Sequence, residues 1–121
     1  MQRVWRTVTG FYHVCARGTG RQLIFKGDED RWEFLELMRE CCCEEGVTVI
    51  AWCLMGNHVH LVLTDYEDRM SAAMHRLLLT YARRFNKRTG RTGHLFQNRF
   101  DRRSLDTDWQ VMEAIRSVHA D

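Results

Sequence analysis

The stretch from residue 47 to residue 64 has the clearest pattern of apolar and polar positions in the chain. Val47–Leu54 is an apolar, β-branched run, and His58–Thr64 alternates histidines with valine and leucine. Because successive side chains of a strand point to opposite faces, both segments are predicted to be strands. Only Met55–Asn57 separates them, which is too short for a parallel crossover and predicts an antiparallel hairpin.

Helical periodicity marks three other segments. Apolar residues recur at three- and four-residue steps over residues 28–45 and again over residues 68–88, which predicts two amphipathic helices. Thr107–Gln110 fits a capping box and predicts that a last helix starts at Thr107. The two apolar stripes consist of Trp32, Leu35, Met38 and Cys42 in the first helix and Met70, Ala73, Met74, Leu77, Leu78, Tyr81 and Phe85 in the second.

Two further segments complete the predicted sheet. Val4–Cys15 is rich in β-branched and aromatic residues, and His94–Arg103 can be written as an alternating strand. The resulting order predicts one α+β domain over residues 1–121. We expect a ferredoxin-like βαββαβ fold with a four-stranded antiparallel sheet, helices on one face and an extra C-terminal helix.

Composition indicates an ordinary globular chain. It has 121 residues, of which 45% are hydrophobic and 28% charged. It contains neither a run of about 18 apolar residues nor a secretory signal, so we expect a cytoplasmic protein with no membrane contact. The five cysteines form no Cys-x-x-Cys pair, which favours reduced thiols. Proline is absent and the helical pattern runs to the last residue, so we expect that a natural C-terminal tail is missing.

Charge is concentrated in one region. Residues 76–103 contain nine arginines and lysines and one acid, Asp101, a net +8 in a chain whose total is +2. A cationic face of this kind is suited to a polyanion, most commonly a nucleic acid, although a solvated basic face without a partner would give the same count.

The alternating strand from residue 58 supplies the candidate chemistry. His58 and His60 are two residues apart, so their imidazoles share one face of the sheet. Two neighbouring imidazoles can hold a divalent cation that polarises a phosphate. The alternative is a pair of surface histidines without a ligand.

Five segments of the chain carry distinctive motifs: Tyr12–Gly18, Arg21–Phe25, Ala51–Leu61, Tyr81–Asn86 and Gly93–Phe100. Together they resemble the single-tyrosine HUH transposases, in particular the REP-associated tyrosine transposases of bacteria. Gly56 replaces the proline that is usual in this family. The resemblance implies a metal-dependent endonuclease and strand transferase that acts in DNA transposition and recombination through a phosphotyrosine intermediate. Its substrate would be single-stranded DNA, usually beside a hairpin.

The same resemblance assigns roles to individual residues. His58 and His60 would hold Mg²⁺ or Mn²⁺. The last helix of the family typically reads Arg-Tyr-Ile-His-x-Asn-Pro, whereas this chain ends at residues 116–121 with Ser117 at the tyrosine position and Asp121 at the asparagine position. Aspartate is a good Mg²⁺ or Mn²⁺ ligand, but serine is much shorter than tyrosine, so we expect impaired cleavage. Tyr81 is a weaker alternative nucleophile.

A second reading keeps the DNA and omits the chemistry: a non-catalytic module that binds single-stranded or hairpin DNA. Base stacking would fall to aromatic residues, for which Tyr66, Phe96, Phe100 and Trp109 are candidates. Because the family includes dimers, a homodimer is left open. In either reading, the expected DNA contacts are Arg17, Arg21, Arg83, Arg84, Lys87, Arg88, Arg91, Arg99, Arg102 and Arg103.

Overall fold

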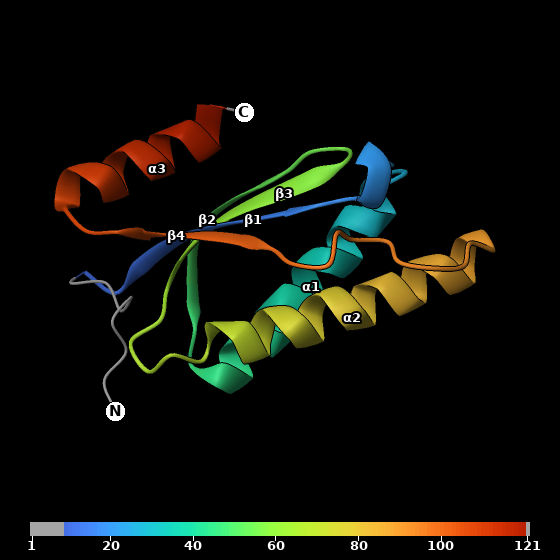
Figure 1. The fold of residues 1–121 in the computed structure, drawn as a ribbon, viewed down its shortest axis with the longest axis horizontal. Helices are drawn as coiled ribbons and strands as arrows, with labels where there is room; N and C mark the ends of the chain where they lie inside the picture. The colour runs from blue at the N-terminus through green and yellow to red at the C-terminus, as the bar shows by residue number, and fades with distance from the viewer. Residues whose placement is uncertain (1–8, 121) are drawn as a thin grey trace.

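A four-stranded antiparallel sheet forms the centre of the molecule. The computed structural model describes residues 9–120, and in that range the strand order is β2-β3-β1-β4 (Figure 1). This is the strand order of the ferredoxin-like plan, so the predicted α+β fold is confirmed. The strands are β1 (Phe11–Arg17), β2 (Thr48–Leu54), β3 (His58–Thr64) and β4 (Asp101–Leu105).

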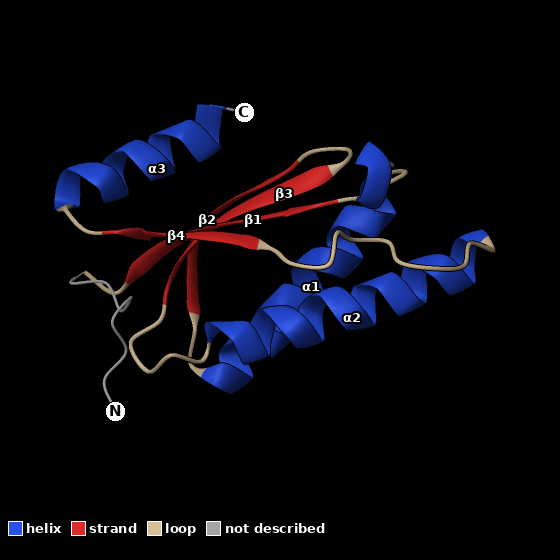
Figure 2. Cartoon of the chain, viewed as in Figure 1, coloured by secondary structure: helices blue, strands red, loops and turns tan. Residues whose placement is uncertain are grey.

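Helices cover both faces of this sheet unequally. The long helices α1 (Asp28–Glu45) and α2 (Met70–Thr89) pack side by side against one face, and α3 (Asp108–Ala120) lies against the other (Figure 2). A short 3₁₀ helix, η1 (Thr19–Arg21), follows β1. None of the helices within residues 9–120 is long and apolar enough to span a membrane.

The main core lies between the sheet and the two long helices. On the face covered by α1 and α2, β1 contributes Val14 and β3 contributes Leu61, which are register partners and fully buried. The predicted stripe of α2 is confirmed, because all its members are buried except Leu78, which is partly buried. The predicted stripe of α1 is wrong at Trp32, whose side chain is 67% exposed, because the helix turns Phe34 and Leu37 inward instead.

A second, smaller core holds α3 on the opposite face. Val111, Ala114 and Val118 of the helix pack on residues of the sheet that include Ala51 and Val62. The predicted capping box is present, because the Thr107 hydroxyl accepts a hydrogen bond from the Gln110 backbone N–H and the Gln110 side-chain oxygen accepts one from the Thr107 backbone N–H.

Two predicted strand boundaries need correction. Residues 94–100 form a loop, and β4 begins only at Asp101. The neighbours Leu95 and Phe96 are both buried, so the expected alternation fails, and the Arg91 guanidinium holds the loop by donating to backbone carbonyls of Gly93 and His94. At the other end, β1 continues to Arg17, while residues 4–8 of the predicted first strand lie outside the described residues.

The start of α2 depends on one buried carboxylate. Asp65 is 2% exposed, and its two oxygens accept hydrogen bonds of 2.8 Å from the backbone N–H groups of Arg69 and Met70. Replacing a capping carboxylate removes charge-assisted bonds, so Asp65→Ala is expected to lower the free energy of unfolding by about 2 kcal/mol. Urea denaturation measures this loss. Asp65→Asn retains one acceptor oxygen and should lose less, and equal losses in the two variants would contradict the capping role.

Candidate metal centre and nucleic-acid surface

Strand β3 places two imidazoles together on the sheet face opposite α1 and α2, the face against which α3 packs. His58 and His60 are partly buried, and their ring centroids are 4.9 Å apart with the rings perpendicular. The prediction that they share a face is confirmed. Because they are fixed on a central strand of the sheet, their separation is set by the backbone rather than by loop motion.

A third imidazole, which the sequence reasoning did not single out, joins them from β1. His13 Nε2 lies 3.2 Å from His60 Nδ1, within hydrogen-bond distance. Burial lowers the pKa of His13, and the nearby His60 and Arg103 lower it further. The neutral ring that this favours can accept a hydrogen bond from His60 Nδ1–H. Alternation along β1 puts His13 on this face, but only the strand pairing places it beside His60.

The Nδ1 atoms of His58 and His60 therefore both lie within hydrogen-bond distance of a protein partner. Asn57 Oδ1 lies 2.7 Å from His58 Nδ1, and His13 Nε2 lies 3.2 Å from His60 Nδ1. A partner at Nδ1 fixes the tautomer and directs Nε2 toward a metal, which is the usual arrangement around metal-binding histidines. The donor chemistry of the pair thus fits a divalent cation that also accepts oxygen ligands, such as Mn²⁺.

The pair supplies only part of a ligand set. Within residues 9–120, no three or more His, Cys, Asp or Glu side chains form a group able to hold a metal ion. The predicted third ligand, Asp121, lies outside the described residues.

The two candidate nucleophiles lie in different environments. Ser117 is exposed on α3, next to Val118, which is buried against the sheet. Tyr81 is fully buried in the main core, where its hydroxyl donates to the Ile24 carbonyl. Burial raises the pKa of Tyr81 far above its usual range. Tyr81 lies on the side of the sheet that α1 and α2 cover, opposite the histidines. The prediction of Tyr81 as an alternative nucleophile is therefore wrong.

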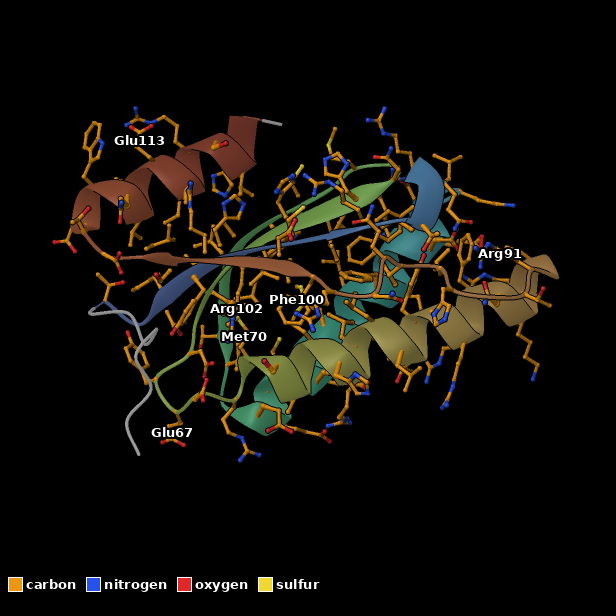
Figure 3. All side chains as sticks on the ribbon, viewed as in Figure 1. Glu67, Met70, Arg91, Phe100, Arg102 and Glu113 are labelled. Carbon is orange, nitrogen blue, oxygen red and sulfur yellow. The ribbon has the colours of Figure 1, made fainter. Side chains whose placement is uncertain are left out.

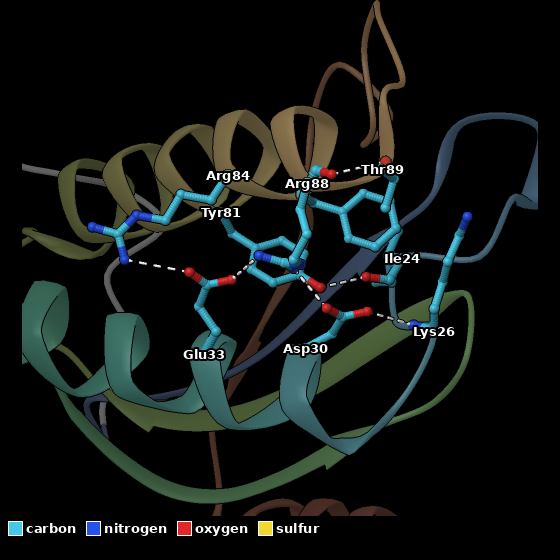
Figure 4. A network of polar contacts seen from close by, with 9 residues as sticks. Ile24, Lys26, Asp30, Glu33, Tyr81, Arg84, Arg88 and Thr89 are labelled. Carbon is cyan, nitrogen blue, oxygen red and sulfur yellow. Dashed lines mark hydrogen bonds and ion pairs between the residues drawn. The ribbon is translucent and has the colours of Figure 1, made fainter.

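Three of the predicted DNA-contacting arginines are engaged within the fold. Arg88 contacts Asp30 at 2.6 Å and Glu33 at 2.7 Å, and Arg84 contacts Glu33 at 3.5 Å (Figure 4). These ion pairs join α2 to α1. Arg91 donates to the Gln22 side chain at 2.6 Å, besides the loop carbonyls described above. Sequence reasoning did not separate these residues from the remaining basic residues.

Five of the remaining seven basic residues lie on two surfaces. Arg17 forms an exposed ion pair of 3.1 Å with Asp101 on the histidine face, where Arg103 stands opposite His13 in the register. Arg83, Arg99 and Arg102 line a groove between α2 and residues 93–102. Arg21 and Lys87 are exposed elsewhere.

One family model matches this chain, and two solved structures share its fold. The model of the family described as "Transposase IS200 like" matches residues 7–117. The structure of a REP-associated tyrosine transposase bound to a REP hairpin has a TM-score of 0.75 at 12% identity, covering 98% of this chain and 70% of that one. The structure of a candidate transposase from Deinococcus radiodurans R1 has a TM-score of 0.61 at 17% identity, covering 91% and 88%. The search of curated proteins gave no match.

Proposed function

Since this chain belongs to the IS200-like transposase family, we propose that it is a DNA-processing domain that binds single-stranded or hairpin DNA and a divalent cation. The observation that carries the proposal is the β3 pair, His58 and His60, with both Nδ1 atoms held by protein partners. The structural relative bound to a REP hairpin supports DNA of that shape as the partner.

The residues of the histidine face have separable tasks in this proposal. His58 and His60 would hold Mg²⁺ or Mn²⁺, and Asp121 would complete the ligand set. When bound, the cation supplies charge neutralisation at the non-bridging oxygens of a phosphodiester. Arg17 and Arg103 lie on the same face and would orient the flanking phosphates through their guanidinium groups.

The residue at the nucleophile position differs from the one that the proposed chemistry needs. A phosphotyrosine intermediate needs a phenol, and Ser117 occupies the position that the family resemblance gives to the tyrosine. A serine hydroxyl ends several ångströms short of a tyrosine hydroxyl and also needs an activating base. We therefore infer that the chain binds its DNA and metal but forms the covalent intermediate poorly. If no covalent intermediate forms at all, the chain is the non-catalytic DNA-binding module of the second interpretation.

Restoring the phenol tests this proposal directly. Labelled hairpin oligonucleotides with single-stranded flanks are mixed with wild-type protein, Ser117→Tyr, or Ser117→Tyr combined with His58→Ala, in Mn²⁺ or in EDTA. We expect all three proteins to shift the oligonucleotide on a native gel. On a denaturing gel, only Ser117→Tyr in Mn²⁺ should give a covalent adduct, because only that sample has both phenol and metal site.

Two results would contradict parts of the proposal. A metal-dependent adduct of the wild-type protein would show that a nucleophile is already present, and mass spectrometry would locate it. Failure of the wild-type protein to shift any oligonucleotide, together with no Mn²⁺ binding, would overturn the proposed function. Because Ser117 is exposed, its replacement is expected to leave the fold intact.

A further inference from the structure

A groove of about 950 Å³ runs between α2 and the segment of residues 93–102 that leads into β4. It lies at the edge of the sheet, on the side of α1 and α2. Figure 3 shows Phe100 and Arg102 in the space between the β4 segment and α2. Its size is at the upper end of the roughly 300–1,000 Å³ range of small-ligand sites, although the groove is open along its length.

The charge of this groove is uncompensated. Arg83, Arg99 and Arg102 line it, and no aspartate or glutamate does. Among the ion pairs found in the described part of the chain, none involves these three arginines, and Arg102 makes only a 3.4 Å contact with the Ser71 hydroxyl. The adjacent Arg84 is different, because it faces α1 and pairs with Glu33. The groove is thus suited to an anion with several charges.

The floor of the groove is apolar and partly accessible. Leu79 is 42% exposed, and Phe100 packs on the main core with part of its ring open. At the rim, the side chains of Gln97 and Asn98 are exposed. A cationic wall, an apolar floor with an aromatic ring and polar amides at the edge form the combination that binds unpaired nucleotides: phosphates on the arginines and bases on the floor.

The groove does not lie on the histidine face. Arg102 pairs in register with Val14, which points into the main core, whereas Arg103 pairs with His13 on the opposite face. Adjacent arginines of the edge strand β4 therefore point to the two sides of the sheet. A nucleic-acid strand that crosses this edge can meet both surfaces, although only one carries the imidazoles.

We propose that this groove binds an unpaired stretch of the DNA substrate that is separate from the phosphate held at the histidines. The inference rests on the proposed function, because it assumes that DNA is the ligand. The phosphates of this stretch contact Arg83, Arg99 and Arg102, and its bases lie on Leu79 and Phe100. The duplex stem of the hairpin is the competing occupant, and the experiment below separates the two.

Fluorescence anisotropy with a short labelled oligothymidine, which forms no hairpin, tests this inference. Arg83→Gln and Arg99→Gln are expected to weaken binding several-fold each. Each should also reduce the slope of log affinity against log salt by about 0.7, the value for one phosphate contact on a single strand. The matched control is Arg84→Gln on the same helix, which changes the same charge but leaves the slope as in the wild type. An abasic oligomer of equal length should bind more weakly, because its phosphates lack bases for the floor.

Three results would overturn the inference. In the first, the groove variants bind oligothymidine with the wild-type salt slope. In the second, they lose affinity only for a blunt duplex, which would assign the groove to the hairpin stem. In the third, the abasic oligomer binds as tightly as oligothymidine. Hairpin binding by the wild-type protein is measured alongside. If that binding is absent, the proposed function itself fails, whereas if it is present with unaffected groove variants, only the groove assignment fails.

Discussion

Tyr81→Ala is expected to lower the free energy of unfolding by about 3–5 kcal/mol, the range for truncating a large buried aromatic side chain. The Tyr81 ring is at the centre of an aromatic cluster, with ring centroids 5.3 Å from Phe34, 5.7 Å from Phe25, 5.8 Å from Phe85 and 6.2 Å from Phe96. These rings come from both long helices and from the two loops beside them, so the variant leaves a cavity where four segments meet. Urea denaturation followed by circular dichroism measures the loss.

Tyr81→Phe separates the ring from the hydroxyl. This variant keeps the packing and loses only the hydrogen bond to the buried Ile24 carbonyl, so a smaller loss of about 1–3 kcal/mol is expected. A catalytic phenol would behave differently, because Tyr81→Phe would then abolish adduct formation while sparing stability. In the Ser117→Tyr background, we expect Tyr81→Phe to leave the adduct unchanged, and its disappearance from a folded protein would contradict a purely structural role.

Segments with strong local periodicity were predictable from the sequence. The hairpin of residues 47–64 and the buried stripe of α2 follow from alternation and from helical spacing, which need no knowledge of the partner surface. In α1, two apolar stripes compete, one through Trp32 and one through Phe34, and only packing against the sheet decides between them. The loop of residues 94–100 could be written as a strand because the Arg91 contacts that hold it are absent from any sequence pattern.

The candidate site shows the same division between local and non-local information. Alternation within β3 is enough to put His58 and His60 on one face. The contribution of His13 depends on the β1–β3 register, which links residues 47 positions apart. The different surroundings of two neighbouring arginines of α2 also could not be predicted from composition. Successive residues of a helix are rotated by about 100°, so Arg84 meets the acids of α1 while Arg83 faces the groove.

His13→Leu is expected to weaken Mn²⁺ binding by about 10- to 100-fold, the usual effect of removing the partner that orients a metal-binding histidine. In the proposed site, His60 needs its Nδ1–H held so that Nε2 faces the cation, and His13 Nε2 is within hydrogen-bond distance of that nitrogen. Leucine fills a similar volume without an acceptor. His13→Gln supplies a side-chain oxygen at comparable reach and should recover most of the affinity.

Titrating Mn²⁺ and following the free-ion signal by electron paramagnetic resonance gives the affinity without any nuclease assay. His58→Ala and His60→Ala remove ligands and should abolish the binding, whereas His75→Ala, on the exposed surface of α2, is the matched control and should leave it unchanged. If folded His13→Leu binds Mn²⁺ as tightly as the wild type, His13 does not orient His60. If His13→Leu and His13→Gln lose affinity equally, the loss comes from packing on β1 rather than from the missing acceptor, because glutamine differs from leucine chiefly in offering one.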